Sequence, residues 1–457
     1  MIRGQQITQR LGLSRALAVA MGVLVGALTA ADRLAAFASV AVLGLGVALA
    51  APLNSLFFGF VAVAFIDVSP ITIHGTYLRL YQVLAPILIL RWALTRPHLT
   101  RNRVFVGLGL WWLAYWPAYG RVIDHAAFWT VVLGEAFLIV VTYFVYQFLT
   151  ARSAAFRIAA FRMLIWGAII VVLSGLIQVA LPIHGLHEQM AGGILRPSGF
   201  MREADWYGTV CTYAALVLIW VLLFEKYNVV SRSVARIALS MAIVGDLLSL
   251  SRASWLGLAV GGAGLLWWWR RDRHNPILAR LVLAFSLVCL LGLAVTLMFP
   301  SVSLHFWARI NPATALSASS SAGYSHLYAV ELMWSLIRRH VLTGWGAGQM
   351  AYFSRDAFYR QLFAGGGAIN TGDSSANFVL NQWFESGLVG LMLMAGWMTA
   401  IFKTPTVAEG TILKIVLVAL LINFLLSNGI NFGFVWITIA FILSFSSPSP
   451  GVARTQF

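Results

Sequence analysis

Residues 127–149 read AFWTVVLGEAFLIVVTYFVYQFL, an apolar run that contains one charged side chain, Glu135. A helix needs about 20 predominantly apolar residues to cross the hydrocarbon core of a bilayer. The run is long enough, so it predicts a membrane-spanning helix. A carboxylate inside such a helix is costly unless it is protonated or paired. Arg79 is one candidate partner for Glu135, and lining a central cavity is the alternative role.

Similar runs extend from this segment in both directions. They predict an all-α, polytopic integral membrane protein with about 14 transmembrane helices, in a range of about 12–14. The predicted spans are residues 16–30, 34–52, 54–67, 78–94, 104–119, 127–149, 160–181, 206–224, 234–250, 253–269, 278–299, 378–402, 411–427 and 430–446. We divide the chain into N-terminal helices (1–159), a core (160–299), a large helical outer loop (300–377) and C-terminal helices (378–457).

The composition agrees with a membrane protein. Of the 457 residues, 60% are hydrophobic and only 10% are charged, with a mean hydropathy of +0.84. Soluble domains carry about 25% charged residues, so an ordinary cytosolic enzyme is excluded, as is a disordered or fibrous chain. The two cysteines, Cys211 and Cys289, lie in apolar runs and are expected to be buried rather than paired or metal-bound.

The formal net charge of +16 suggests a nucleic-acid partner at first sight. Basic residues, however, remain on the cytoplasmic side of membrane proteins. When the N-terminus is placed inside, most of the 31 Lys and Arg residues fall in inner loops, and both termini are cytoplasmic. The excess charge therefore reflects topology, and we expect no nucleic-acid partner. The inner loops are short, so the chemistry is expected on the outer side, in the loops 182–205 and 300–377.

The large outer loop contains two predicted helices, residues 325–341 and 349–363. The first places an apolar set at helical spacing, and the second is rich in aromatic residues. The expected apolar face of the first helix is Leu327, Val330, Trp334, Ile337 and Val341. These helices would lie on the membrane surface or close over a cavity as a lid, and a purely structural cap is the alternative. Between them, Gly344, Gly346 and Gly348 predict a tight turn, and residues 365–367 predict a hinge.

Arginines on the outer side are the strongest candidates for chemistry. Arg196 lies in the loop 182–205, and Arg252 lies at the junction of two spans. The guanidinium group offers a planar fork of donors that fits phosphate oxygens and is always charged. A structural ion pair with Asp246 is the alternative for Arg252. Arg202 is a weaker candidate because Glu203 and Asp205 follow it closely.

A stripe of polar residues lies at the start of the predicted span 378–402. Asn377, Asn381 and Glu385 are four residues apart, so they share one face of a helix. This face could bind a sugar-phosphate group, or it could be a hydrogen-bonded seam between helices. His326, at the start of the first predicted loop helix, is a candidate general base. We find no sequence pattern for a metal or nucleotide-sugar site and expect neither metal nor cofactor.

Several short motifs occur in a telling order. They are RPSGF at residues 196–200, YG at 207–208, SRASW at 251–255, TGWGAG at 343–348, and NFVLN with ESGLVGL within 377–391. Over residues 160–400, this order resembles the O-antigen ligase and O-antigen polymerase superfamily of bacterial polysaccharide enzymes. The resemblance implies a glycosyltransferase of the bacterial inner membrane whose active site faces the periplasm.

The resemblance also implies the partners. The donor and acceptor would be undecaprenyl-pyrophosphate-linked oligosaccharides, and a chain-length regulator is a further possible partner. Arg196 and Arg252 match the family's pyrophosphate-binding arginines by position. Ligases of the family typically have His where this chain has Ala376, and this departure favours a polymerase of O-antigen or exopolysaccharide. An O-antigen ligase, a peptidoglycan glycosyltransferase and a lipid-linked sugar flippase remain the alternatives.

The predicted site combines these residues. The candidate catalytic residues are Arg196, Arg252, Glu203, Asp205, His326, Asp373 and Glu385. The candidate substrate-binding residues are Arg196, Arg202, Arg252, Tyr207, Arg309, Asn377 and Asn381. The general base is left open among the acidic residues and His326.

Overall fold

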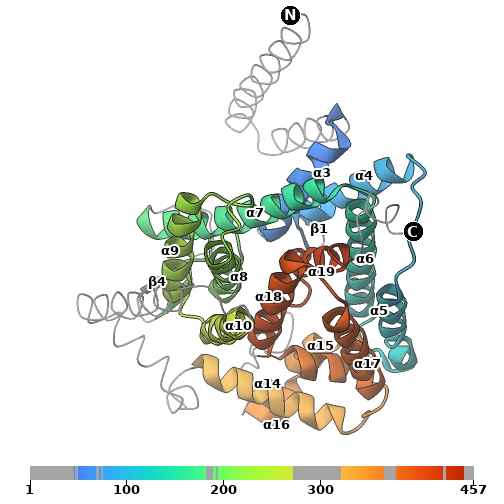
Figure 1. Ribbon diagram of the computed structural model, residues 1–457. Coiled ribbons are helices and arrows are strands. Elements are labelled where there is room, and N and C mark those ends of the chain that lie inside the picture. Colours follow the sequence, from blue (N-terminus) through green and yellow to red (C-terminus); the bar gives the residue numbers. More distant parts are fainter. Residues whose placement is uncertain are drawn as a thin grey trace, which may run out of the picture. The chain divides into compact units, whose positions relative to one another are not determined.

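The computed structural model (Figure 1) describes residues 46, 50–67, 71–73, 76–181, 189–191, 194–270, 321–364, 377–425 and 429–446. The chain divides into two compact units. The first comprises Met1–Phe57 and Leu84–Arg96, and the second comprises Phe58–Val83 and Pro97–Phe457. In the first unit, the described residues are helical segments and their ends. All the site residues discussed below belong to the second unit.

The elements are helical apart from two short strand pairs. The helices are α3 (Leu53–Ala62), η1 (Val63–Phe65), α4 (Leu80–Ala93), α5 (Arg103–Leu113), η2 (Trp116–Arg121), α6 (His125–Thr150), α7 (Ala154–Ala180), α8 (Ala204–Leu223), α9 (Arg232–Ser249), α10 (Arg252–Arg270), α14 (Ser321–Ile337), α15 (Met350–Arg355), α16 (Ala357–Ala364), α17 (Phe378–Lys403), α18 (Ala408–Phe424) and α19 (Gly433–Ser444). The strands are β1 (Ile71–Ile73), β2 (Thr76–Leu78), β3 (Gln189–Ala191) and β4 (Ile194–Arg196), paired antiparallel as β1–β2 and β3–β4.

The predicted helical membrane architecture is confirmed in its main outline. Each predicted span between residues 54 and 269, and each one after residue 377, coincides with a described helix. Among the described residues, four helices are long and apolar enough to cross a membrane: α6, α7, α8 and α17. The count of about 14 spans is therefore not confirmed. The spans 16–30 and 278–299 lie outside the described residues, as does most of the span 34–52. The short β3–β4 hairpin, which the sequence did not indicate, carries Arg196.

The helix that contains residues 127–149 is α6. The Asp124 side chain caps it by accepting a hydrogen bond from the Ala127 amide at 2.9 Å. Within the helix, buried Glu135 accepts a hydrogen bond from the Tyr115 hydroxyl at 3.0 Å. Arg79 instead forms an ion pair with Asp67. The predicted pairing of Glu135 with Arg79 is therefore wrong, because each group has a nearer partner on a neighbouring segment.

Helix α8 is enclosed by four neighbouring helices of the second unit. It packs against α7, α9, α10 and α18 (Figure 1), and most of its side chains are buried, including Cys211 as predicted. A second cluster joins α5, α17 and α19, where the rings of Trp111, Trp397 and Trp436 lie within 5.8–6.1 Å of one another. These contacts hold α5, α17 and α19 together.

The helices of the large loop pack against α17. Buried side chains of α14 and α15, including Leu332, Met333 and Phe353, form one apolar core with Phe384. Two helical regions were predicted here, and the second is divided into α15 and α16 at Asp356. The predicted apolar face was partly wrong, because Trp334 and Val341 are 40% and 39% exposed. Compared with the predicted orientation, α14 is rotated about its axis, so that its Ala, Leu and Met residues face the core.

Helix α17 is interrupted at Gly387, which has φ 68° and ψ −174°. The segment 341–348 bridges the interruption. The amides of Trp345 and Gly346 donate to the carbonyls of Phe384 and Glu385 at 2.8 and 3.0 Å, and the amide of Leu388 donates to the Val341 carbonyl at 2.8 Å. The bridge thus satisfies backbone groups that a broken helix leaves without partners. The predicted tight turn is present, and its function is to join the loop to α17.

Candidate functional site

The candidate site is the corner where α8, α9 and α10 meet the β4 strand. Arg196 is 8% exposed, and its Nε donates to the Ser249 carbonyl at 2.7 Å. Its Nη2 forms an ion pair with Asp205 Oδ1 at 2.8 Å. The Asp205 side chain is 44% exposed. Arg196 is thus fixed at the end of α9, while the carboxylate that it meets remains open to the surroundings.

Arg252 is the first residue of α10 and belongs to the same corner. Asp205 lies close enough to interact electrostatically with it. Among the described residues, the buried Nε–H of Arg252 has no hydrogen-bond acceptor. A buried donor without a partner is rare in proteins and costs about 1–3 kcal/mol. The Nε atoms of Arg121 and Arg152 are also buried without an acceptor, so this donor marks Arg252 as a candidate anion ligand only together with its position at the corner near Asp205.

The predicted alternative for Arg252, an ion pair with Asp246, is wrong. Asp246 is 1% exposed and forms no ion pair among the described residues, with Ser254 lying beside its carboxyl group. The reason is the turn between α9 and α10. Leu250 adopts a left-handed conformation with φ 53°, so the chain reverses between the two residues. Such strained non-glycine residues concentrate at functional sites.

The loop between β4 and α8 is fixed to α7. The Gln178 side chain accepts hydrogen bonds from the amides of Ser198 and Gly199, each at 2.9 Å. The Ser174 hydroxyl accepts another from the Phe200 amide at 3.1 Å. These contacts account for the RPSGF motif and hold Arg196 in place. Ser174 and Gln178 were not among the predicted site residues, although two polar residues four apart in an apolar span were a usable signal.

Gly199→Ala is expected to disrupt this loop. Gly199 has φ 54°, and an added Cβ would lie 2.5 Å from the Ser174 hydroxyl and 2.7 Å from the Gly175 amide. The left-handed conformation alone costs a side chain about 1–2 kcal/mol. We expect a loss of about 2 kcal/mol or more of stability, measured as a lower unfolding temperature in detergent. Gly134→Ala, at a helical position with open space, is the matched control. Equal unfolding temperatures for the two variants would contradict the expectation.

Tyr207 and Gly208 support the corner from α8. Tyr207 is fully buried, and its hydroxyl donates to the Val172 carbonyl at 2.8 Å. A Cβ at Gly208 would lie within 2.7 Å of the hydroxyls of Ser249 and Ser254. The structure therefore places Tyr207 as a residue that holds α7 and α8 together, whereas the sequence analysis predicted contact with substrate.

The polar stripe of α17 forms a separate group. Asn377 caps the helix through the amides of Val379 and Leu380. Glu385 is 5% exposed and accepts a hydrogen bond from the Gly348 amide at 3.0 Å, and Asn381 also interacts with its carboxyl group. Among the described residues, no hydrogen bond or ion pair connects these three to Arg196 or Arg252. These contacts are a helix cap, a pairing within α17 and a hydrogen bond to the segment 341–348, rather than the predicted seam between two helices.

The remaining predicted residues divide into two groups. Arg202 and Glu203 are partly exposed in the turn before α8. Arg309 and Asp373 lie outside the described residues, and of His326 only the backbone, within α14, is described. The described part of the site is therefore three arginines, Arg196, Arg202 and Arg252, with two acidic residues, Glu203 and Asp205, at or next to this corner. Guanidinium groups are suited to binding a phosphate or pyrophosphate group.

The comparison with known families covers part of this site. Residues 237–395 match the family model described as O-antigen ligase, whose members are glycosyltransferase-like enzymes. The matched segment contains Arg252, α10 and the loop helices α14–α16, while Arg196 lies before it. No curated protein matches the chain. The resemblance inferred from the motifs is thus confirmed by this family match, which covers residues 237–395 of the chain.

Proposed function

We propose that the protein polymerises undecaprenyl-pyrophosphate-linked oligosaccharide units into O-antigen or exopolysaccharide at the periplasmic face of the bacterial inner membrane. The observation that carries the proposal is the corner formed by Arg196 and Arg252. One arginine is held by a carbonyl and a carboxylate, and the other keeps a buried donor without a partner. This arrangement suits an anionic group that binds between a fixed and an available guanidinium.

The proposed reaction is glycosyl transfer with inversion. The bond between the anomeric carbon and the pyrophosphate oxygen breaks as an acceptor hydroxyl attacks from the opposite face. The leaving pyrophosphate gains negative charge in this step. Preoriented positive groups stabilise charge that develops in a transition state, and they need no reorganisation during the reaction. Arg196 and Arg252 would fill this role, and the mechanism requires neither metal nor cofactor.

The acceptor hydroxyl must lose a proton to a base. Two acidic side chains at the start of α8 are partly exposed: Glu203, which precedes the helix, and Asp205, in its first turn. Asp205 is already ion-paired with Arg196, so we assign it to orienting that arginine. Glu203 is the proposed base, because it lies in the same turn and is accessible to the surroundings.

The two acids can be separated kinetically with purified protein in lipid nanodiscs. Glu203→Gln is expected to lower kcat by about 10²–10⁴-fold, the usual contribution of a general base, with little change in KM. Asp205→Asn is expected to raise the KM for the lipid-linked donor, because Arg196 loses its orienting partner. The measurement is the initial rate of glycosidic bond formation at varied donor concentration. An unchanged kcat for Glu203→Gln would remove Glu203 from the mechanism.

An O-antigen ligase is the second candidate, since the matching family model carries that description. The same purified protein can be given the donor alone, or the donor together with lipid A-core. A polymerase makes longer lipid-linked chains from the donor alone, whereas a ligase forms a product only when lipid A-core is present. Translocation of the donor without any new bond would indicate a flippase and would contradict the proposed function.

A further inference from the structure

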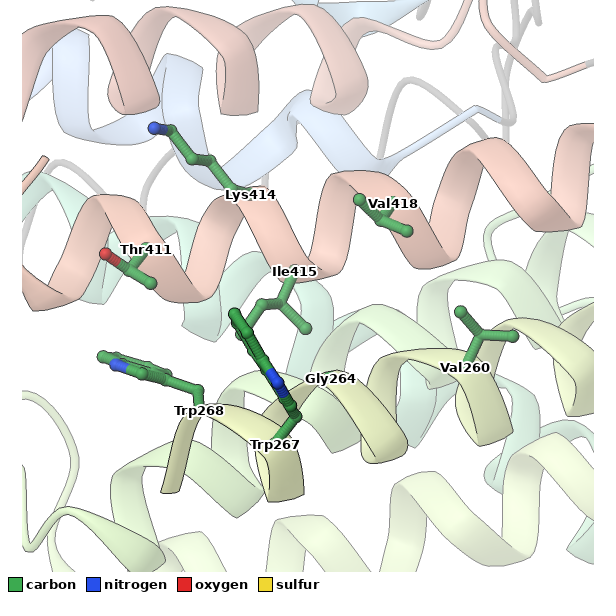
Figure 2. A pocket seen from close by; sticks show the side chains of 8 residues that line it. All are labelled: Val260, Gly264, Trp267, Trp268, Thr411, Lys414, Ile415 and Val418. Carbon is green, nitrogen blue, oxygen red and sulfur yellow. The ribbon is translucent and has the colours of Figure 1, made fainter. Parts of the chain in front are cut away.

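A groove of about 390 Å³ lies between α10 and α18, toward the end of α10 that is far from Arg252. Val260, Gly264, Trp267 and Trp268 line it from α10, and Thr411, Lys414, Ile415 and Val418 line it from α18. Figure 2 shows the Trp267 side chain rising from α10 toward Ile415 of α18, while the Trp268 side chain extends to the side of the helix. At 1.5 Å per residue, Trp268 lies about 24 Å along the helix from Arg252, so the groove is distinct from the candidate site.

The groove exists because the packing of the two helices changes along their length. Near Arg252, a Cβ on Gly257 would lie 2.8 Å from the Ala419 carbonyl oxygen, so the helices are in close contact there. Farther along, the small residues of α10 give way to tryptophans. Trp268 stacks on Phe224 of the α8 end, with ring centroids 4.5 Å apart. This stacking holds one wall of the groove in place.

The walls are apolar and the groove lies near the helix ends. Trp267 is 61% exposed, and α10 ends only a few residues beyond it, at Arg270. Thr411 is close to the start of α18 at Ala408. Tryptophan is enriched at the boundary between hydrocarbon and water in membrane proteins. The groove is therefore suited to a hydrocarbon chain that enters from the edge of the bilayer.

The mouth of the groove carries positive charge. Arg270 ends α10 and Lys403 ends α17, and both are exposed. The ammonium group of Lys414 donates to the carbonyls of Phe402 and Thr404, which flank Lys403, so the end of α17 is held beside the groove. Of the two described acidic residues near this end of the groove, Glu409 is ion-paired with Lys226 at 3.5 Å, and Glu225, next to Phe224, is exposed. The cations at the mouth thus favour an anionic headgroup.

We propose that this groove binds an anionic phospholipid from the leaflet opposite the Arg196 and Arg252 corner. One acyl chain lies between the tryptophans of α10 and Val418 of α18, and the phosphate lies beside Arg270 and Lys403. A zwitterionic lipid would bring a positive group to a mouth that is already positive. The isoprenoid tail of a donor held at Arg252 would bring no negative charge to this end.

The test uses the full-length protein in nanodiscs with phosphatidylglycerol that carries a diazirine on one acyl chain. After irradiation, mass spectrometry should find the label in peptides that contain residues 260–268 and 411–418. Arg270→Gln should reduce this labelling about fivefold, since one cation near a membrane surface contributes about 1 kcal/mol to the attraction of anionic lipid. Arg236→Gln, an exposed arginine on α9, is the matched control and should leave the labelling unchanged.

A second variant tests the position of the chain. Val418 is 37% exposed and lines the groove, so Val418→Trp should fill the groove and remove the label without disturbing the core. Equal labelling by a phosphatidylcholine probe, or no response to Arg270→Gln, would show unselective annular lipid and overturn the proposal. Displacement of the label by a polyprenyl phosphate would overturn it in favour of the donor tail. Absence of label from both peptides would also overturn it.

Discussion

Replacing Arg252 with alanine is expected to abolish polymer extension while the protein accumulates normally. Removing one preoriented donor from a site of developing charge typically costs about 10²–10³ in kcat. The structural cost should be small, because the buried Nε–H of Arg252 has no acceptor among the described residues. Arg252→Lys should recover only part of the rate, since an ammonium group lacks the planar fork of guanidinium.

The measurement is polymer length and initial rate with lipid-linked donor and equal amounts of protein in nanodiscs. Arg236→Ala is the control, because it removes an exposed arginine from α9 and should leave the rate unchanged. Arg196→Ala should also abolish extension, but it also removes the contacts with Ser249 and Asp205 and should lower stability. Polymers of normal length from the Arg252→Ala protein would refute the assigned role.

Gly387→Ala is expected to have the largest effect on stability. Gly387 has φ 68° and ψ −174°, a region of backbone conformation that is essentially restricted to glycine. An added Cβ would also overlap the Leu342 carbonyl group. The substitution should break the hydrogen bonds between the segment 341–348 and α17. We expect a loss of about 3 kcal/mol or more, which is a large part of the stability of a typical domain.

The control for this substitution lies on the same helix. Gly396 of α17 is exposed, and no atom lies within 4 Å of an added Cβ. Gly396→Ala should be neutral or should stabilise the protein by up to about 1 kcal/mol, the difference in helix propensity. Unfolding temperatures in detergent compare the two variants directly. If Gly387→Ala unfolds at the wild-type temperature, the bridge across the helix break does not contribute to stability.

The local features of the fold could be predicted from the sequence. Residues 127–149 became α6, and the segments 160–181 and 206–224 became α7 and α8, because the period and length of an apolar run are properties of that run alone. The family resemblance was recognised from short motifs and their order along the chain, both of which can be read directly from the sequence. The match over residues 237–395 confirms it. The polymerase assignment and the pyrophosphate role of Arg196 stay predictions.

The partners of buried polar groups could not be predicted in the same way. Glu135 was matched with Arg79 by charge, but Tyr115 and Asp67 are the residues that the packing brings to them. The face of α14 was also misassigned, because several rotations of that helix bury an apolar set. Tertiary packing decides among them through the neighbouring helix, α17.

The sequence by itself determined that this chain is a helical membrane protein with arginines at the ends of its central spans. Only the tertiary structure decided which arginine is fixed and which is available, since Arg196 meets Ser249 and Asp205 while Arg252 keeps an unpaired donor. It also decided that the glycine turn joins the loop to a broken α17. The physical reason for this difference is that the hydropathy of a segment depends only on neighbouring residues. A hydrogen bond between helices instead depends on two groups that are distant in sequence.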